Sequence, residues 1–202
     1  FELQFSSPVA PGKPAPDVII DAKQAAIVCG LGAPGLHGKI IAPKYGTFMR
    51  YVFIITDMPL ACDKPFIGTL CDGCEECIKA CPGRAYAEDG KLDSWRCAVY
   101  YNGANGSKNP FMPPEAFSNF ENRMDIIDGT AEFDAEGAKE ILDNIYFYPP
   151  AQHAYQCSIC GRACDMSCYI HLEKNGVLTK SFKTPFRKRE EWKFKIEDFE
   201  NN

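Results

Sequence analysis

Four cysteines in the middle of the chain have the spacing of iron-sulfur cluster ligands. They form the run Cys71-x2-Cys74-x2-Cys77-x3-Cys81, and Pro82 follows the last of them. In a run of this kind the first three thiolates bind one 4Fe-4S cluster, whereas the fourth, which precedes the proline, ligates a second cluster. The run therefore predicts two clusters. It requires four more thiolates, one for the first cluster and three for the second.

The chain after residue 90 contains five cysteines for these four positions. Cys97 stands alone, and the other four form the run Cys157-x2-Cys160-x3-Cys164-x3-Cys168. A crossed arrangement adds Cys164 to the first cluster, and it combines Cys157 and Cys160 with Cys81 on the second. Cys97 and Cys168 compete for the remaining position. Zinc sites or buried free thiols are the alternative, but zinc usually binds two C-x2-C pairs, and the spacing of the first run suits a cubane better.

The ordered cysteines and the segment before them resemble a known family. Gly30–Leu60, the Cys71 run, the tripeptide Trp95-Arg96-Cys97 and the Cys157 run are similar to the C-terminal half of the epoxyqueuosine reductase and reductive dehalogenase superfamily. The resemblance covers roughly residues 18 to 172, and it implies a corrinoid-dependent iron-sulfur enzyme. In that family a lone cysteine in an Arg-Cys context completes the second cluster, which implies Cys97.

The resemblance thus implies two ligand sets. The first is Cys71, Cys74, Cys77 and Cys164, and the second is Cys81, Cys97, Cys157 and Cys160. Cys168 is then a spare, buried thiol, and the same is expected of Cys29 and Cys62. The chain departs from the family in having Asp165 where a proline usually follows Cys164, and in continuing the second run to Cys168. The family's N-terminal corrinoid-binding region and its proton donor have no counterpart in these residues, so no catalytic residue is predicted.

A loop with four glycines precedes the first predicted strand. The resemblance implies that this loop lies near a corrinoid, where glycines admit the flat macrocycle and Lys39 meets a polar substituent. The alternative is a tight crossover into the strand. His37 is predicted to be a solvated or hydrogen-bonded imidazole rather than an axial cobalt ligand or a proton donor. His153 and His171 flank the second run, where they could tune a cluster or simply pack. The candidate cofactor-binding residues are Gly30, Gly32, Gly35, His37, Gly38 and Lys39.

The rest of the pattern predicts short helices and one sheet segment. We expect a helix over Asp17–Cys29 that ends at Gly30, and two strands, Lys39–Ala42 and Phe48–Thr56, because β-branched and aromatic residues are enriched there. Further helices are predicted within Glu75–Ala80, which Pro82 ends, within Asp93–Tyr101, and over the amphipathic stretch Asp134–Phe147. The second cysteine run is expected to continue as a helix to Leu172, with Gly176 as its stop.

These elements predict an α+β fold, in which a partial nitroreductase-like sheet segment precedes a ferredoxin-like module with two 4Fe-4S clusters. The predicted organisation has four parts: an extended lead-in (1–17), an α/β segment related to a corrinoid-binding part (18–66), the dicluster module with the inserted helix 134–147 (67–172), and a basic, aromatic tail (173–202).

Composition restricts the class of protein. The chain has 202 residues, 46% of them hydrophobic, and a formal charge of -5. Two clusters of about -2 each would bring this to roughly -9, which argues against nucleic-acid binding. Apolar runs of 18 residues are absent, so no membrane span is predicted. Eleven closely spaced cysteines indicate a reducing compartment, such as the cytoplasm. Because the first residue is Phe1 and not Met, we expect either processing or a longer chain, whose missing segment could direct export.

Two functions follow from these observations. The first is a reductive oxidoreductase, which receives low-potential electrons from a donor such as ferredoxin or flavodoxin and passes them through two clusters to a corrinoid. The second is a dicluster electron-transfer or regulatory subunit without catalysis of its own, which docks on a corrinoid-bearing partner through the basic and aromatic tail 180–195.

Overall fold

The protein is described here by a computed structural model. It covers residues 21–145, except 53, 55, 63 and 88, and residues 159–183. The predicted lead-in, Cys157, His153 and the tail beyond residue 183 lie outside the described residues. The described chain is a mixed structure of short helices with one small sheet, which agrees with an α+β class.

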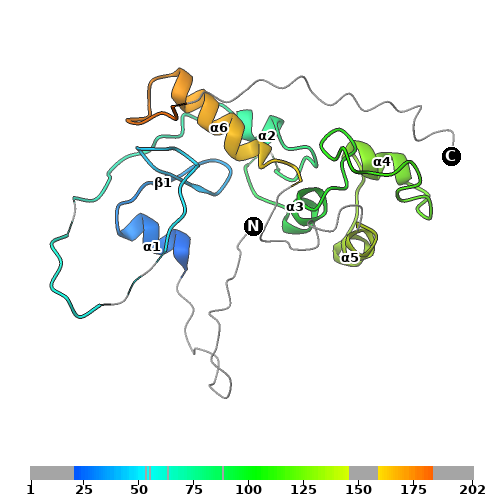
Figure 1. The fold of residues 1–202 in the computed structure, drawn as a ribbon, viewed down its shortest axis with the longest axis horizontal. Coiled ribbons are helices and arrows are strands. Elements are labelled where there is room, and N and C mark those ends of the chain that lie inside the picture. Colours follow the sequence, from blue (N-terminus) through cyan, green and yellow to red (C-terminus); the bar gives the residue numbers. More distant parts are fainter. Residues whose placement is uncertain are drawn as a thin grey trace, which may run out of the picture.

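The first helix and the hairpin after it form one end of the molecule (Figure 1). Helix α1 (Ala22–Val28) begins at Asp21, whose carboxylate accepts hydrogen bonds from the next turn, and Gly30 closes it in the predicted left-handed conformation with φ of +67°. Strands β1 (Ala33–Pro34) and β2 (Ile40–Ile41) then pair antiparallel, with Ala33 opposite Ile41. Gly35 and Gly38 lie in the turn between the two strands, whereas Gly30 and Gly32 precede β1.

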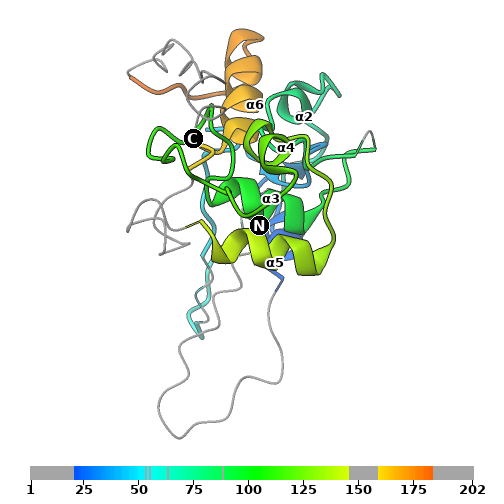
Figure 2. The ribbon, with the colours of Figure 1, turned by 90° about the vertical axis from the view of Figure 1, so that its right-hand side faces the viewer.

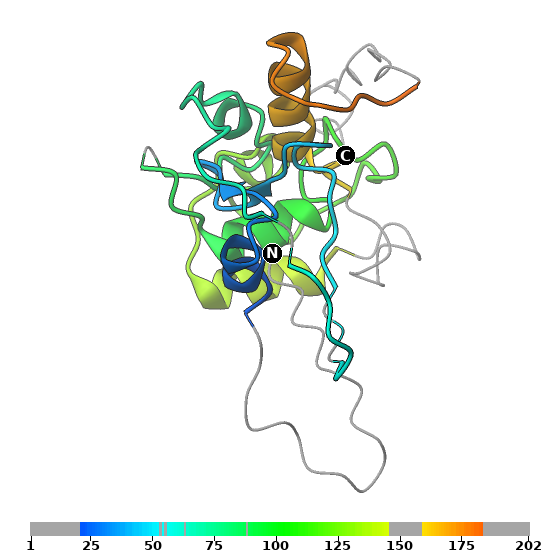
Figure 3. The same ribbon diagram turned by 90° about the vertical axis from the view of Figure 1, so that its left-hand side faces the viewer.

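The second predicted strand, Phe48–Thr56, is wrong for the residues that the structure describes. Phe48 packs against Tyr169, but the chain after it runs away from the helices without forming a strand (Figures 1 and 3), and the side chains of Val52 and Ile54 are 82% and 84% exposed. A strand requires a neighbouring edge for its hydrogen bonds, and the described chain offers none to this segment. The nitroreductase-like sheet therefore stays a prediction.

Helices α2 (Glu76–Lys79) and α6 (Ala163–Lys174) carry cysteines of the two runs and pack against each other at the centre of the fold (Figures 1 and 2). Helix α2 lies within the first run, as predicted. Helix α6 contains the last two cysteines of the second run and is closed at Gly176, which confirms the predicted stop. Ile41, Cys77, Cys168 and Leu172 form a small buried core between α2, α6 and the hairpin, so the predicted α/β segment and the cysteine-bearing helices share one core.

Three further helices form a larger apolar core beside the cysteine-bearing helices (Figures 1 and 2). Helix α3 (Ser94–Tyr101) begins at the predicted cap Asp93. Helix α4 (Arg123–Asp128) was not predicted, and it ends at Gly129 with φ of +89°. Helix α5 (Ala135–Asp143) begins at Asp134, as predicted, but it ends earlier than predicted, because Asn144 already departs from helical geometry. Among the described residues, no helix is long and apolar enough to cross a membrane.

Candidate metal centre

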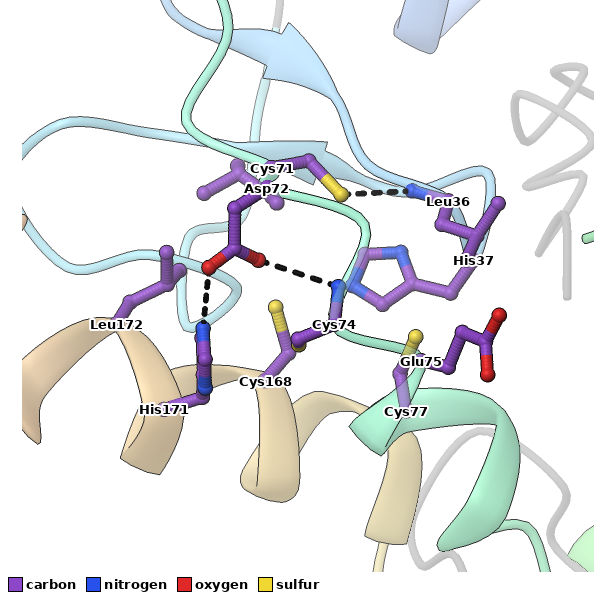
Figure 4. A pocket seen from close by; sticks show the side chains of 11 residues that line it. Leu36, His37, Cys71, Asp72, Cys74, Glu75, Cys77, Cys168, His171 and Leu172 are labelled. Atoms are coloured by element: carbon purple, nitrogen blue, oxygen red, sulfur yellow. Dashed lines mark hydrogen bonds and ion pairs between the residues drawn. The ribbon is translucent and has the colours of Figure 1, made fainter. Parts of the chain in front are cut away.

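A pocket between the hairpin, α2 and α6 brings four cysteines together (Figure 4). Three are the first members of the first run, and the fourth is supplied by α6. Cys77 and Cys168 are buried, with 5% and 8% of their surface exposed. The pocket has an empty volume of about 300 Å³, which includes some open solvent. The four thiols that line it belong to Cys71, Cys74, Cys77 and Cys168.

Hydrogen bonds lie at the edge of this pocket. The backbone N–H of Leu36 donates to Sγ of Cys71 at 3.4 Å. The Asp72 carboxylate accepts from the backbone N–H of Cys74 at 3.2 Å, and it lies 2.7 Å from Nε2 of His171. A donor to sulfur, such as the Leu36 N–H, stabilises the negative charge of a thiolate. The ligand atoms of Asp72, Cys74 and His171 lie within 4.8 Å of one another, so the predicted flanking His171 belongs to the rim of the first pocket.

The imidazole of His37 points into the same pocket (Figure 4). Its Nδ1 accepts a hydrogen bond from the backbone N–H of Lys39 at 3.1 Å, whereas its Nε2 is buried and has no protein partner in the described part of the chain. Burial, followed by the nearby charge of Lys39, lowers the pKa of His37 to about 4. The ring is therefore neutral at pH 7, and because Nδ1 is an acceptor, the proton lies on Nε2. This nitrogen is a donor directed at the thiols.

The remaining described cysteines of the two runs form a second group around Cys97. Burial, and then the neighbouring thiols of Cys160, Cys164 and Cys81, raise the pKa of Cys97 to about 11. The backbone N–H of Ala85 donates to Sγ of Cys81 at 3.3 Å. The structure thus brings Cys81, Cys97 and Cys160 together, as the sequence predicts, and Cys164 lies with them. Cys157 lies outside the described residues.

A buried ion pair holds Cys164 in place. Nζ of Lys39 donates to Sγ of Cys164 at 3.0 Å and to Oδ1 of Asp165 at 2.7 Å, and the Arg162 guanidinium pairs with the other Asp165 oxygen. Burial disfavours the charge of Lys39, but the Cys164 thiol and the Asp165 carboxylate outweigh this effect and raise its pKa. Burial and the Cys164 thiol also raise the pKa of Tyr86. The family's proline position thus holds a buried carboxylate that ties α6 to the glycine loop.

The glycine loop packs against its own chain. A Cβ atom on Gly30 would lie 2.1 Å from Cα of Pro65, and one on Gly32 would lie 2.2 Å from the carbonyl oxygen of Ile41. Gly35 lies against the Ile41 side chain, and Gly38 makes the turn with φ of +71°. These are the contacts of a tight crossover into β2, which is the alternative that the sequence left open.

Sequence reasoning missed one residue of this centre, Tyr86, and it gave no role to Asp165, whereas the expectation that Cys168 is buried is confirmed. The spacing of Cys164 and Cys168 contained a signal, because it repeats the spacing of Cys77 and Cys81. For Tyr86 no sequence signal was available. The expectation that Cys29 and Cys62 are buried is wrong, because both thiols are exposed.

Two groups of buried and partly buried cysteines around α2, α3 and α6 define a cysteine-rich protein with candidate metal sites. Part of this chain is similar to proteins named epoxyqueuosine reductase. The one from Bacillus cereus is 35% identical over 95 residues, which are 47% of this chain and 24% of the relative. The one from Bacillus subtilis is 30% identical over 95 residues, which are 47% of this chain and 23% of the relative. The one from a Synechococcus species is 38% identical over 72 residues, which are 36% of this chain and 22% of the relative.

The chain spans about a quarter of the length of these relatives. No family model and no solved structure matches it. The likenesses support the resemblance to the epoxyqueuosine reductases, whereas the reductive dehalogenase part of that resemblance stays a prediction.

Proposed function

We propose that this chain is the electron-transfer part of an iron-sulfur reductase and that it holds two 4Fe-4S clusters. The observation that carries the proposal is the first pocket, where four thiols converge between α2 and α6 with a second group of thiols beside them. A bound 4Fe-4S cluster takes up and releases one electron at low potential. Two such clusters in neighbouring sites give electrons a route through the protein.

The chain's own residues fit this role. Burial raises the pKa of Cys97 and Cys168, so both are protonated at pH 7, and a bound iron would be needed to hold them as thiolates. The protonated Nε2 of His37 is a buried donor whose acceptor is missing unless a sulfur occupies the pocket. Backbone donors to Cys71 and Cys81 serve the same purpose. The eight-cysteine ligand set expected from the sequence remains a prediction, and so does a donor such as ferredoxin or flavodoxin.

The resemblance implies that a corrinoid is the electron acceptor. The contacts of the glycine loop do not fit a corrinoid. The close contacts of Gly30 and Gly32 are with the chain itself, and Lys39 is engaged by Cys164 and Asp165. His37 is 2% exposed and points toward the thiols, so it offers no axial nitrogen. We therefore propose that the acceptor, a corrinoid by resemblance, is not bound by residues 30–39.

Elemental analysis of anoxically prepared protein tests this function. We expect about eight irons and eight sulfides per chain, and visible absorption that dithionite bleaches. A chain that takes up zinc in preference to iron, or no iron after incubation with ferrous iron and sulfide, would contradict the proposal. Stoichiometric cobalt in the same sample would indicate a bound corrinoid. If Lys39→Ala lost this cobalt, the proposal that residues 30–39 do not bind the corrinoid would be wrong. Full iron without cobalt would favour the electron-transfer subunit over the complete reductase.

A further inference from the structure

We propose that Cys168 completes the first cluster, and that Cys164 is a ligand of the second. This inference rests on the proposed function, because it assigns ligands to the clusters that the function requires. It differs from the sets implied by the family resemblance, in which Cys164 belongs to the first cluster and Cys168 is spare.

The lining of the pocket is the first argument. Cys168 contributes to the same pocket as Cys71, Cys74 and Cys77, whereas Cys164 does not. Figure 4 shows the sulfur of Cys168 directed into the space that the three other sulfurs face. Cys168 is also buried, and with Cys77 it forms part of the small core between α2 and α6. No movement of α6 is needed to place its thiol among the other three.

The surroundings of Cys164 are the second argument. It lies one helical turn before Cys168 on α6, which separates the two Cα atoms by about 6 Å along the axis. Its thiol is held at 3.0 Å by the Lys39 ammonium, and it neighbours Tyr86 and Cys97. The charges of Cys160, Cys164 and Cys81 all act on Cys97, so Cys164 lies near the thiols that the resemblance assigns to the second cluster, and it also packs against the small core beside Cys77.

The spacing of the two runs is the third argument. Cys81 follows Cys77 by four residues, and Cys168 follows Cys164 by four residues. In a crossed pair of runs the last cysteine of each run ligates the cluster of the other. Cys81 lies with the second group, and Cys168 lies in the first pocket, so the two runs exchange their last cysteines. Under the family pattern the second run would end at Cys164, which packs against the small core beside Cys77 but does not line the first pocket.

Paired cysteine variants of the full chain, loaded anoxically with ferrous iron and sulfide, test this assignment. Cys74→Ala removes a ligand of the first cluster in every scheme. If Cys168 serves the same cluster, the double variant Cys74→Ala/Cys168→Ala should keep about four irons and one unperturbed electron paramagnetic resonance signal after reduction with dithionite. Cys74→Ala/Cys164→Ala should leave no unperturbed cluster. Both double variants remove two thiols, so each is a control for the general loss of stability in the other.

The opposite pattern, an intact second cluster in Cys74→Ala/Cys164→Ala but not in Cys74→Ala/Cys168→Ala, would overturn the assignment. Where an alanine variant does not fold, Cys168→Ser supplies the second measurement. An oxygen ligand should change the signal of the same cluster that Cys74→Ser changes, and a change in the other cluster would again overturn the assignment. Cys62→Ala, at an exposed thiol, should retain all the iron. Failure of the wild-type chain to bind iron would instead contradict the proposed function.

Discussion

At the scale of single residues, the first pocket is distinguished by a buried donor, Nε2 of His37, for which the described residues provide no acceptor. His37 is held by its Nδ1, is neutral, and directs a protonated Nε2 at four thiols. An unpaired buried donor costs about 1–3 kcal/mol, so a fold that retains one is expected to use it when the pocket is filled. A hydrogen bond to a cluster sulfur favours the reduced, more negative state, and it therefore raises the reduction potential.

Replacement of His37 should thus change the potential of the first cluster. A hydrogen bond contributes about 1.4 kcal/mol, which corresponds to about 59 mV for a one-electron couple, so His37→Leu should lower the potential by roughly this amount. His37→Gln keeps an N–H donor of similar reach and should restore most of the loss. The measurement is a redox titration followed by electron paramagnetic resonance. Equal shifts in the two variants would show that the donor does not act on the cluster.

The ion pair of Lys39 and Asp165 is the second residue-scale feature. Lys39→Met would leave the Asp165 carboxylate, which is fully buried, with the Arg162 partner alone. Loss of a hydrogen bond between charged groups costs about 1.5–3 kcal/mol, so the free energy of unfolding should fall by about that amount. Lys44→Met removes a charge from the neighbouring exposed lysine and should change little. Thermal unfolding of both variants under anoxic conditions compares them, and similar midpoints would contradict a structural role for the pair.

At the scale of elements, short helices were predictable where a local signal begins or ends them. Asp93 caps α3 and Asp134 caps α5, and both aspartates accept hydrogen bonds from the first turn. The strand predicted over Phe48–Thr56 failed because pairing depends on a partner elsewhere in the fold, which no local pattern supplies. Cys168 was expected to be buried, but the pocket that it lines could not be predicted for a related reason, since this depends on how α6 packs on α2.

The cap of α5 gives a prediction at this scale. Oδ1 of Asp134 accepts from the backbone N–H groups of Glu136 and Gly137 at 3.1 and 2.9 Å. Asp134→Ala should therefore lower the free energy of unfolding by about 1 kcal/mol, as N-cap replacements usually do. Asp143→Ala removes the same charge from the other end of α5, where a carboxylate is unfavourable to the helix dipole, and it should not destabilise. Denaturant unfolding followed by circular dichroism measures the free energy of unfolding of both variants. An equal loss in the two variants would contradict a capping role for Asp134.

At the scale of the whole molecule, the two cores differ in what holds them together. The core of α3, α4 and α5 consists of aliphatic and aromatic side chains, among them the fully buried Ile126 and Ile127. The core between the hairpin, α2 and α6 has four buried members, and two of these are cysteines. A buried thiolate site without its metal loses most of its favourable interactions. The second core should therefore depend on the clusters, whereas the first should not.

Removal of iron by a chelator tests this difference. Amide hydrogen exchange should accelerate in α6 and in the hairpin of β1 and β2, because the four-residue core cannot offset the entropy of ordering these segments alone. Exchange in α5 should change little, since Ala138 and Ile141 are anchored in the larger core. Reconstitution with iron and sulfide should restore protection in α6, which separates cluster loss from irreversible damage. Uniform acceleration along the chain would mean instead that the molecule unfolds as one unit and that the clusters stabilise both cores.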